Sequence, residues 1–191
     1  MVRVPANDPD VMRVYLDMGA QGVLAPFVNT AEDAEIGAKG LRYPPQGIRG
    51  CGPSRAAKYG FDLTYFAEAN DNMLYMGIIE DARAIENIEE IVETEGVDVP
   101  VVGPVDLSIS LGVPMEYEHP KFRDAVKTVI AAAERVRKPV GIGVYGDLFD
   151  PGTYERFLDE GFRVLLAGVD ESLLVASTKK VLDAIGEARG A

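Results

Sequence analysis

The chain is 191 residues long, with 47% hydrophobic and 26% charged residues, which is typical of one globular domain with a substantial core. A formal net charge of −12 argues against a nucleic-acid partner, because nucleic-acid binding needs a basic face. No apolar run reaches the ~18 residues of a membrane span, and MVRVPANDPD at the start contains no apolar signal-peptide core. The single cysteine, Cys51, excludes an internal disulfide, and we therefore expect a cytoplasmic protein without a membrane partner.

Short apolar runs rich in Val, Ile and Leu alternate along the chain with amphipathic stretches of helical spacing. In chain order, we expect strands at Val2–Val4, Gly22–Val28, Leu74–Ile79, Val99–Val102, Val140–Val144 and Val164–Ala167. Helices are expected at Asp10–Met18, Ala31–Ala38, Ala82–Thr94, Phe122–Val136, Thr153–Leu158 and Leu173–Ala184. Asn29-Thr30 and Asp150-Pro151 are helix-start signals, and Gly96 and Gly161 stand where helices should end.

This alternation predicts six βα units in one domain over residues 1–191. Continuous apolar strands indicate a parallel sheet that is buried on both faces, in either an open doubly wound sheet or a (β/α) barrel. The longest stretch without strand character runs from Gly40 to Asn72. A loop of that length is either functional or a packed excursion or oligomer contact.

Two of the predicted strands end at an acid, Glu80 in MGIIED and Asp106 in GPVDLS. If these consecutive strands are neighbours about 4.8 Å apart, both carboxylates project from the same end of the sheet. A divalent ion such as Mg²⁺ or Mn²⁺ would relieve their repulsion and suits oxygen ligands. Alternatively, the acids are helix N-caps or first-turn acids, which any βα loop can carry, or they work as a paired general acid and base.

Two further features lie beside this pair. The turn Gly103–Ser108 directly follows a strand, so its backbone N–H groups can hold an anionic substrate oxygen. Arg3 ends the first predicted strand and suits a carboxylate or enolate oxygen, although a surface ion pair is an equal alternative.

Three other motifs are poor candidates for function. The G-x-G-x-x-G match at 141–146 has its first two glycines inside a predicted strand, which is the wrong context for a dinucleotide. His119, the only histidine, precedes a proline at a predicted surface turn, and Cys51 has no histidine nearby in sequence.

The strings RYPPQGIRG, ANDNM, IEDARAIENIEEI, GPVDLSISLG and AGVDESLL, in this order, resemble the metal-dependent pyruvate aldolases of the 4-hydroxy-2-oxoheptanedioate and 2-keto-3-deoxy sugar-acid type. The resemblance covers nearly the whole chain. It implies a TIM-type (β/α) barrel that binds a divalent metal and reversibly cleaves 4-hydroxy-2-oxo acids to pyruvate and an aldehyde.

By position, the resemblance makes Glu80 and Asp106 the ligands of Mg²⁺ or Mn²⁺, with Co²⁺ as a further option, and makes Arg3 the arginine at the pyruvate carbonyl and its enolate. The substrate carboxylate would be received around Pro104, Val105 and Asp106, with Ser108 in the same turn. The metal ion would stabilise the enolate, and Arg3 would add positive charge at the same oxygen.

Departures from the family pattern qualify this expectation. The family has two βα units before the point where this chain begins, and they carry its general-base histidine, so we expect a truncated barrel and weakened activity. Ile78 stands where the family often has a glutamine. Open barrel edges predict a homo-oligomer, a trimer or hexamer by resemblance. Alternatives are a repurposed activity, such as oxaloacetate decarboxylation or hydrolysis of a small ester or diketone, and a non-catalytic assembly subunit.

Overall fold

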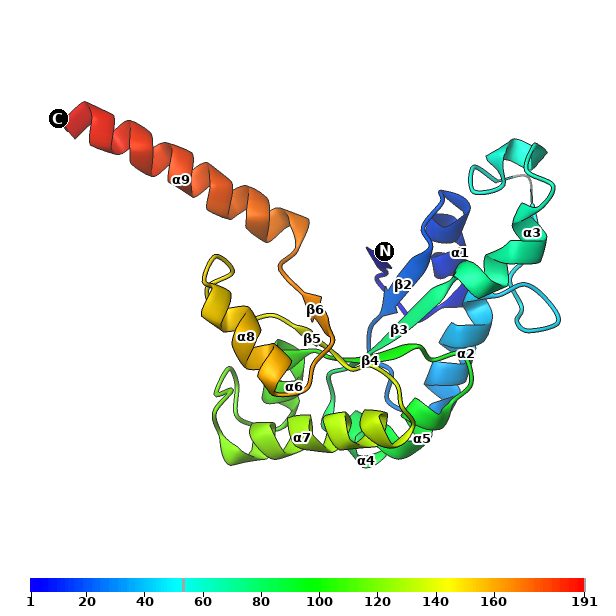
Figure 1. The fold of residues 1–191 in the computed structure, drawn as a ribbon, viewed down its shortest axis with the longest axis horizontal. Coiled ribbons are helices and arrows are strands. Elements are labelled where there is room, and N and C mark those ends of the chain that lie inside the picture. The colour runs from blue at the N-terminus through cyan, green and yellow to red at the C-terminus, as the bar shows by residue number, and fades with distance from the viewer. Residues whose placement is uncertain (53, 191) are drawn as a thin grey trace.

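The computed structural model describes residues 1–52 and 54–190 and contains one sheet of six parallel strands in the order β1-β2-β3-β4-β5-β6 (Figure 1). The strands are β1 Val2–Arg3, β2 Gly22–Ala25, β3 Leu74–Ile79, β4 Val99–Val102, β5 Gly141–Gly143 and β6 Val164–Leu166. Because spatial order equals chain order, every crossover runs in the same direction, and the sheet has no point at which the order reverses. This excludes the doubly wound alternative, and the sheet curls as part of a TIM-type barrel.

Helices cover the outer, convex face of the curled sheet (Figure 1). In chain order the helices are α1 Pro9–Asp17, α2 Ala31–Leu41, α3 Tyr65–Glu68, α4 Ala82–Glu86, α5 Ile88–Glu93, α6 Pro104–Ser110, α7 Pro120–Arg135, α8 Pro151–Asp159 and α9 Asp170–Gly190, with 3₁₀ turns at Lys58–Gly60 and Ala69–Asn72. Of these, α9 extends away from the sheet and does not cover it. Within the described ranges, none of these helices is both long and apolar enough to cross a membrane.

The helix boundaries follow the chemistry expected from the sequence. Thr30 caps α2 in a reciprocal capping box with Asp33, and the side chain of Asp150 caps α8. Gly96 and Gly161 have φ angles of +85° and +111°, the left-handed conformation that favours glycine. These predicted start and stop signals are confirmed.

Three local predictions were wrong. The expected helix at 82–94 is two helices, α4 and α5, separated at Asn87, whose side chain donates to the carbonyl of Asn29 (2.9 Å) and so ties this break to a loop far away in sequence. The expected turn at 103–108 is helix α6, which Gly103 caps and Pro104 starts. The second predicted strand, Gly22–Val28, ends early at Ala25 because the backbone of Phe27 turns to φ +52°.

Residues that alternate along the strands form two apolar layers. The convex layer packs on the helices, whereas the concave layer contains the buried cluster of Leu24, Met76, Ile78, Val99 and Val101. Because strand side chains alternate between faces, the concave row fixes which way the groups at the carboxyl ends of these strands point.

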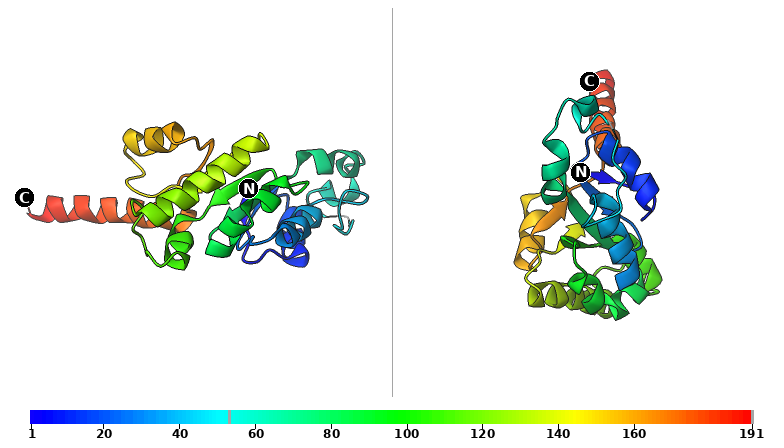
Figure 2. Two further views of the ribbon diagram at one scale, coloured as in Figure 1. Left: turned by 90° about the horizontal axis from the view of Figure 1, so that it is seen from below. Right: turned by 90° about the vertical axis from the view of Figure 1, so that its right-hand side faces the viewer.

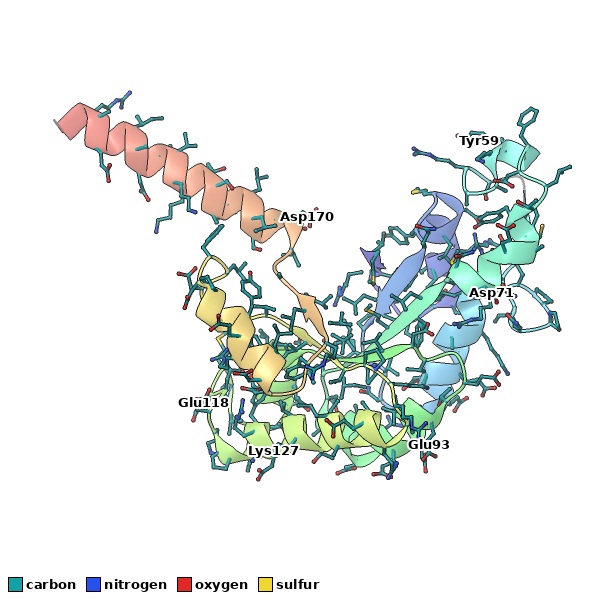
Figure 3. The ribbon with its side chains drawn as sticks, viewed as in Figure 1. Tyr59, Asp71, Glu93, Glu118, Lys127 and Asp170 are labelled. Atoms are coloured by element: carbon teal, nitrogen blue, oxygen red, sulfur yellow. The ribbon has the colours of Figure 1, made fainter. Side chains whose placement is uncertain are left out.

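The long excursion at 40–72 is packed against the body. The Arg49 side chain is completely buried, and its Nη2 donates to Asp17 Oδ1 over 2.9 Å, while its guanidinium lies 4.6 Å from the Tyr43 ring centroid. The tip of the 40–72 segment is exposed, and Figure 3 shows Tyr59 at this tip, far from the sheet. The sequence left open whether this segment is a functional loop or a packed excursion. The part around Arg49 and Tyr43 is a packed excursion.

Candidate active site

Glu80 directly follows β3 and continues the concave row of Met76 and Ile78. Its side chain is buried, with the residue only 4% exposed. One carboxylate oxygen, Oε1, accepts a hydrogen bond from the backbone N–H of Phe27 over 2.9 Å. Glu80 is therefore not a helix cap. That role belongs to its neighbour Asp81, whose side chain accepts from Arg83 N–H.

The pKa of Glu80 reports what surrounds its carboxylate. Burial raises this pKa, and the Phe27 N–H opposes that effect. The negative charge of Asp106 raises the pKa further, whereas the positive charge of Arg3 lowers it. Arg3 in β1 and Asp106 in the first turn of α6, both singled out from the sequence, are thus within electrostatic reach of Glu80.

Arg3 comes to this site through the register of the sheet. It pairs with Leu24 in the β1–β2 ladder, and Leu24 belongs to the concave cluster. The arginine side chain is exposed, and no ion pair of Arg3 within 4.0 Å exists among the described residues. Its charge is consequently available to an anionic group on the concave side.

Asp106 lies in the first turn of α6 and is exposed. The helix cap, Gly103, makes no side-chain hydrogen bond, and Pro104 has no N–H. The first-turn amides that can receive an anion are therefore those of Val105 and Asp106, and contact of Pro104 itself with substrate stays a prediction. Pro104 is buried and fixes the start of the helix.

Gly103 also leaves room for Glu80. A Cβ at this glycine would lie 2.8 Å from Glu80 Cβ and 2.9 Å from Oε2, which is closer than side-chain atoms tolerate. The free oxygen of Glu80 therefore faces the start of α6, the helix that carries Asp106. This space exists only because residue 103 has no side chain.

Ser108 is fully buried. Its hydroxyl donates to Val105 O (2.7 Å) and accepts from Met115 N–H (2.9 Å). These contacts hold α6 and the loop that follows it, so the geometry favours a supporting role for Ser108. Its direct contact with substrate stays a prediction.

The side chains of Glu80 and Asp106 provide two carboxylates for a cation. Within the described chain, no group of three or more His, Cys, Asp or Glu side chains is arranged to hold a metal ion. One or two carboxylates, with water and substrate oxygens for the rest, are what Mg²⁺ usually takes from a protein. A buried carboxylate with one oxygen held and the other facing the start of the helix that carries Asp106 fits such an ion.

The remaining motifs have structural roles here. His119 caps α7, its Nδ1 accepting from Lys121 N–H over 3.2 Å. In the 141–146 motif, Gly141 and Gly143 lie within β5, and the next helix begins only at Pro151. Cys51 is exposed.

Comparisons with known proteins show the family to which the chain is related. Residues 1–177 match the family model described as HpcH/HpaI aldolase/citrate lyase. The chain is 37% identical over 187 residues to a 5-keto-4-deoxy-D-glucarate aldolase of Klebsiella pneumoniae, covering 96% of this chain and 71% of the relative. It is 38% identical over 178 residues to a 4-hydroxy-2-oxovalerate aldolase of Rhodococcus jostii, covering 93% of this chain and 67% of that one.

Solved structures give the same relationship. A HpcH/HpaI aldolase/citrate lyase family protein from Burkholderia cenocepacia superimposes with a TM-score of 0.86 at 33% identity, covering 96% of this chain and 72% of that chain. The likeness in fold therefore extends over nearly the whole chain.

Proposed function

The chain belongs to the HpcH/HpaI aldolase/citrate lyase family, and we propose that it reversibly cleaves 4-hydroxy-2-oxo acids to pyruvate and an aldehyde with the help of a divalent cation. One observation carries this proposal beyond family membership. The buried carboxylate of Glu80 shares its electrostatic environment with Asp106 and Arg3 at the carboxyl ends of the strands, which is where barrel enzymes place their chemistry.

In this proposal Glu80 and Asp106 hold the cation, Mg²⁺ or Mn²⁺, with Co²⁺ as a further option. A bound divalent ion supplies positive charge beside the two oxygens of the 2-oxo acid, and so lowers the energy of the negative charge that develops during cleavage. The metal role of both acids rests on their chemistry and on their position in the family motif.

The other residues act on the substrate itself. The guanidinium of Arg3 faces the keto oxygen and stabilises its developing charge. The amides of Val105 and Asp106 receive the substrate carboxylate at the start of α6. As the C3–C4 bond breaks, its electron pair forms a C2=C3 double bond and the keto oxygen takes up the negative charge beside Arg3. The 4-hydroxyl group loses its proton to water as C4 becomes the aldehyde carbon. C3 then takes up a proton from water as the C2=O bond re-forms, which gives pyruvate.

The activity test measures pyruvate released from 4-hydroxy-2-oxo acids, the substrate class named for two relatives, in a coupled reaction that consumes NADH. We expect release that depends on added Mn²⁺ or Mg²⁺ and stops with a chelator. Release that is indifferent to the chelator rejects the metal role. Absence of release in the presence of bound metal favours a repurposed activity, and absence of both favours an assembly subunit.

We also propose that a second copy of the chain covers α9, and that the protein works as a cytoplasmic homo-oligomer. This 21-residue helix has no buried residue and projects from the body (Figure 2). Leu174, Val175, Val181 and Leu182 are all more than half exposed. An isolated helix of this length gains little stability in water without a packed apolar face, so an unpartnered α9 is unfavourable.

Deleting residues 170–191 is therefore expected to reduce the mass of the particle measured by light scattering, because the deletion removes this exposed apolar surface. The matched control is Lys179→Ala with Glu187→Ala, two exposed charges of the same helix. A full-length monomer at micromolar concentration, or an unchanged mass after deletion, contradicts the assembly role of α9.

A further inference from the structure

Phe27 combines two unusual features at the mouth of the candidate site. Its φ angle is +52°, a left-handed conformation that is uncommon outside glycine and unfavourable for a bulky residue. Its side chain is also 54% exposed, so burial of the ring does not compensate for this cost. A strained residue that gains little from packing calls for another explanation.

The backbone of Phe27 offers one. Its N–H donates to Glu80 Oε1 over 2.9 Å, linking residues 53 apart in sequence. The flanking residues, Pro26 and Val28, are both buried, so the chain enters and leaves this point along the sheet. The left-handed turn at Phe27 aims the N–H at the carboxylate while the ring turns outward.

The residues that follow Phe27 hold this conformation. Val28 N–H donates to Ile78 O over 3.2 Å, and the Val28 side chain approaches to 3.1 Å of the position that a Cβ on Gly77 would occupy. Beyond it, the carbonyl of Asn29 accepts from the Asn87 side chain. Such surroundings over-determine a backbone that would otherwise relax.

The consequence concerns which oxygen of Glu80 is free. Oε1 is occupied by the Phe27 N–H, whereas Oε2 faces the space beside Gly103 and the start of α6. A carboxylate held at one oxygen loses its rotational freedom and presents the other in a fixed direction. Hydrogen bonds of this kind to metal-binding side chains typically contribute 10–100-fold to metal affinity.

We propose that Phe27 is a positioning residue, whose left-handed backbone holds Glu80 so that its second oxygen is presented to the cation. This inference rests on the proposed function, because it assigns the cation to Glu80. It attributes the effect to the backbone of residue 27 and not to the aromatic ring.

Two substitutions at the same position separate backbone from ring. Phe27→Val favours extended backbone and strongly disfavours positive φ, so we expect Mn²⁺ affinity to fall about tenfold. Phe27→Gly removes the ring but adopts positive φ freely, so we expect affinity within about twofold of the parent chain. Affinity is measured by titrating Mn²⁺ into the full chain and following the free ion by electron paramagnetic resonance.

Arg137 provides the matched control. It also has positive φ, +59°, and is exposed, but its N–H donates to Glu134 O at the end of α7. Arg137→Val therefore introduces the same backbone strain away from Glu80, and Mn²⁺ affinity should not change. Circular dichroism and thermal unfolding in the presence of a chelator establish that every variant is folded.

Each outcome has one meaning. The positioning role is overturned if Phe27→Val binds Mn²⁺ as tightly as the parent chain, or if Phe27→Gly loses as much Mn²⁺ affinity as Phe27→Val. It is also overturned if Arg137→Val loses as much affinity as Phe27→Val, because the effect is then general destabilisation. If the parent chain binds no Mn²⁺, the metal part of the proposed function fails. Hydrogen exchange at the amide of residue 27, in the parent and in Glu80→Ala, then reports whether the hydrogen bond itself exists.

Discussion

Glu80→Gln is expected to abolish Mn²⁺ binding and to reduce metal-dependent pyruvate release more than a hundredfold. Loss of a residue that only supports a metal ligand typically costs 10–100-fold in affinity or activity, and loss of the ligand itself should cost more. The neutral amide keeps the shape of the side chain and an oxygen that can accept from Phe27 N–H. It removes the negative charge on the one carboxylate of the pair that is buried. Calorimetric titration with Mn²⁺ and the coupled pyruvate assay measure the two effects.

The same substitution should stabilise the metal-free protein at neutral pH. Burial raises the pKa of Glu80 in the folded chain, so the folded state binds this proton more tightly than the unfolded state and loses stability as the carboxylate ionises. The gain from Gln is full above the folded pKa and disappears below about pH 4, the ordinary range of a glutamate. Thermal unfolding with a chelator, at a series of pH values, measures this gain.

Asp81→Asn is the control for both measurements. It removes a charge at the adjacent position, and asparagine caps helices as well as aspartate does, so the cap of α4 is retained. We expect parental Mn²⁺ affinity in this variant. Unchanged affinity in Glu80→Gln itself would show that the cation binds elsewhere.

Arg3→Met is expected to lower kcat for pyruvate release by about 10²–10³ and to leave saturating Mn²⁺ binding intact. The guanidinium provides charge beside the developing enolate in the proposed reaction, and methionine keeps much of the side-chain volume without that charge. A loss confined to KM would indicate that Arg3 only binds the ground state. Steady-state kinetics at saturating Mn²⁺ distinguish these cases.

Arg3→Met is also expected to change how Mn²⁺ affinity falls as the pH is lowered. The charge of Arg3 lowers the pKa of Glu80, so its removal raises that pKa, and protons compete with Mn²⁺ up to a higher pH. The control is Arg13→Met, an exposed arginine of α1 whose ion pair is with Asp10. An identical pH dependence of Mn²⁺ affinity in the parent and in Arg3→Met would contradict the interaction with Glu80.

Much of this architecture follows from local sequence patterns. Apolar runs of three to seven residues between amphipathic stretches identified all six strands that the structure contains, because buried parallel strands and surface helices have different periodicities. The positions of Glu80, directly after one strand, and of Asp106, four residues after the end of the next strand, were visible in the same way. The roles of both acids stay proposals.

Three features of the site were decided only by tertiary structure. The turn at Phe27 has no sequence signal, because phenylalanine does not favour positive φ, and a loop held by Ile78 and Asn87 imposes it. The break at Asn87 depends on the same distant contact. The need for glycine at 103 arises because Glu80 from the neighbouring strand end occupies that space.

The division has one physical cause. Helix and strand periods, caps and turn residues act over a few neighbouring positions, so the sequence by itself determined the βα order and the parallel sheet, and it located one acid directly after β3 and another in the βα segment after β4. Contacts between residues 53 apart, such as Phe27 and Glu80, exist only after the strands pair in register and the sheet curls. The tertiary structure therefore decided which carboxylate is buried, which of its oxygens is held, and where the other one faces.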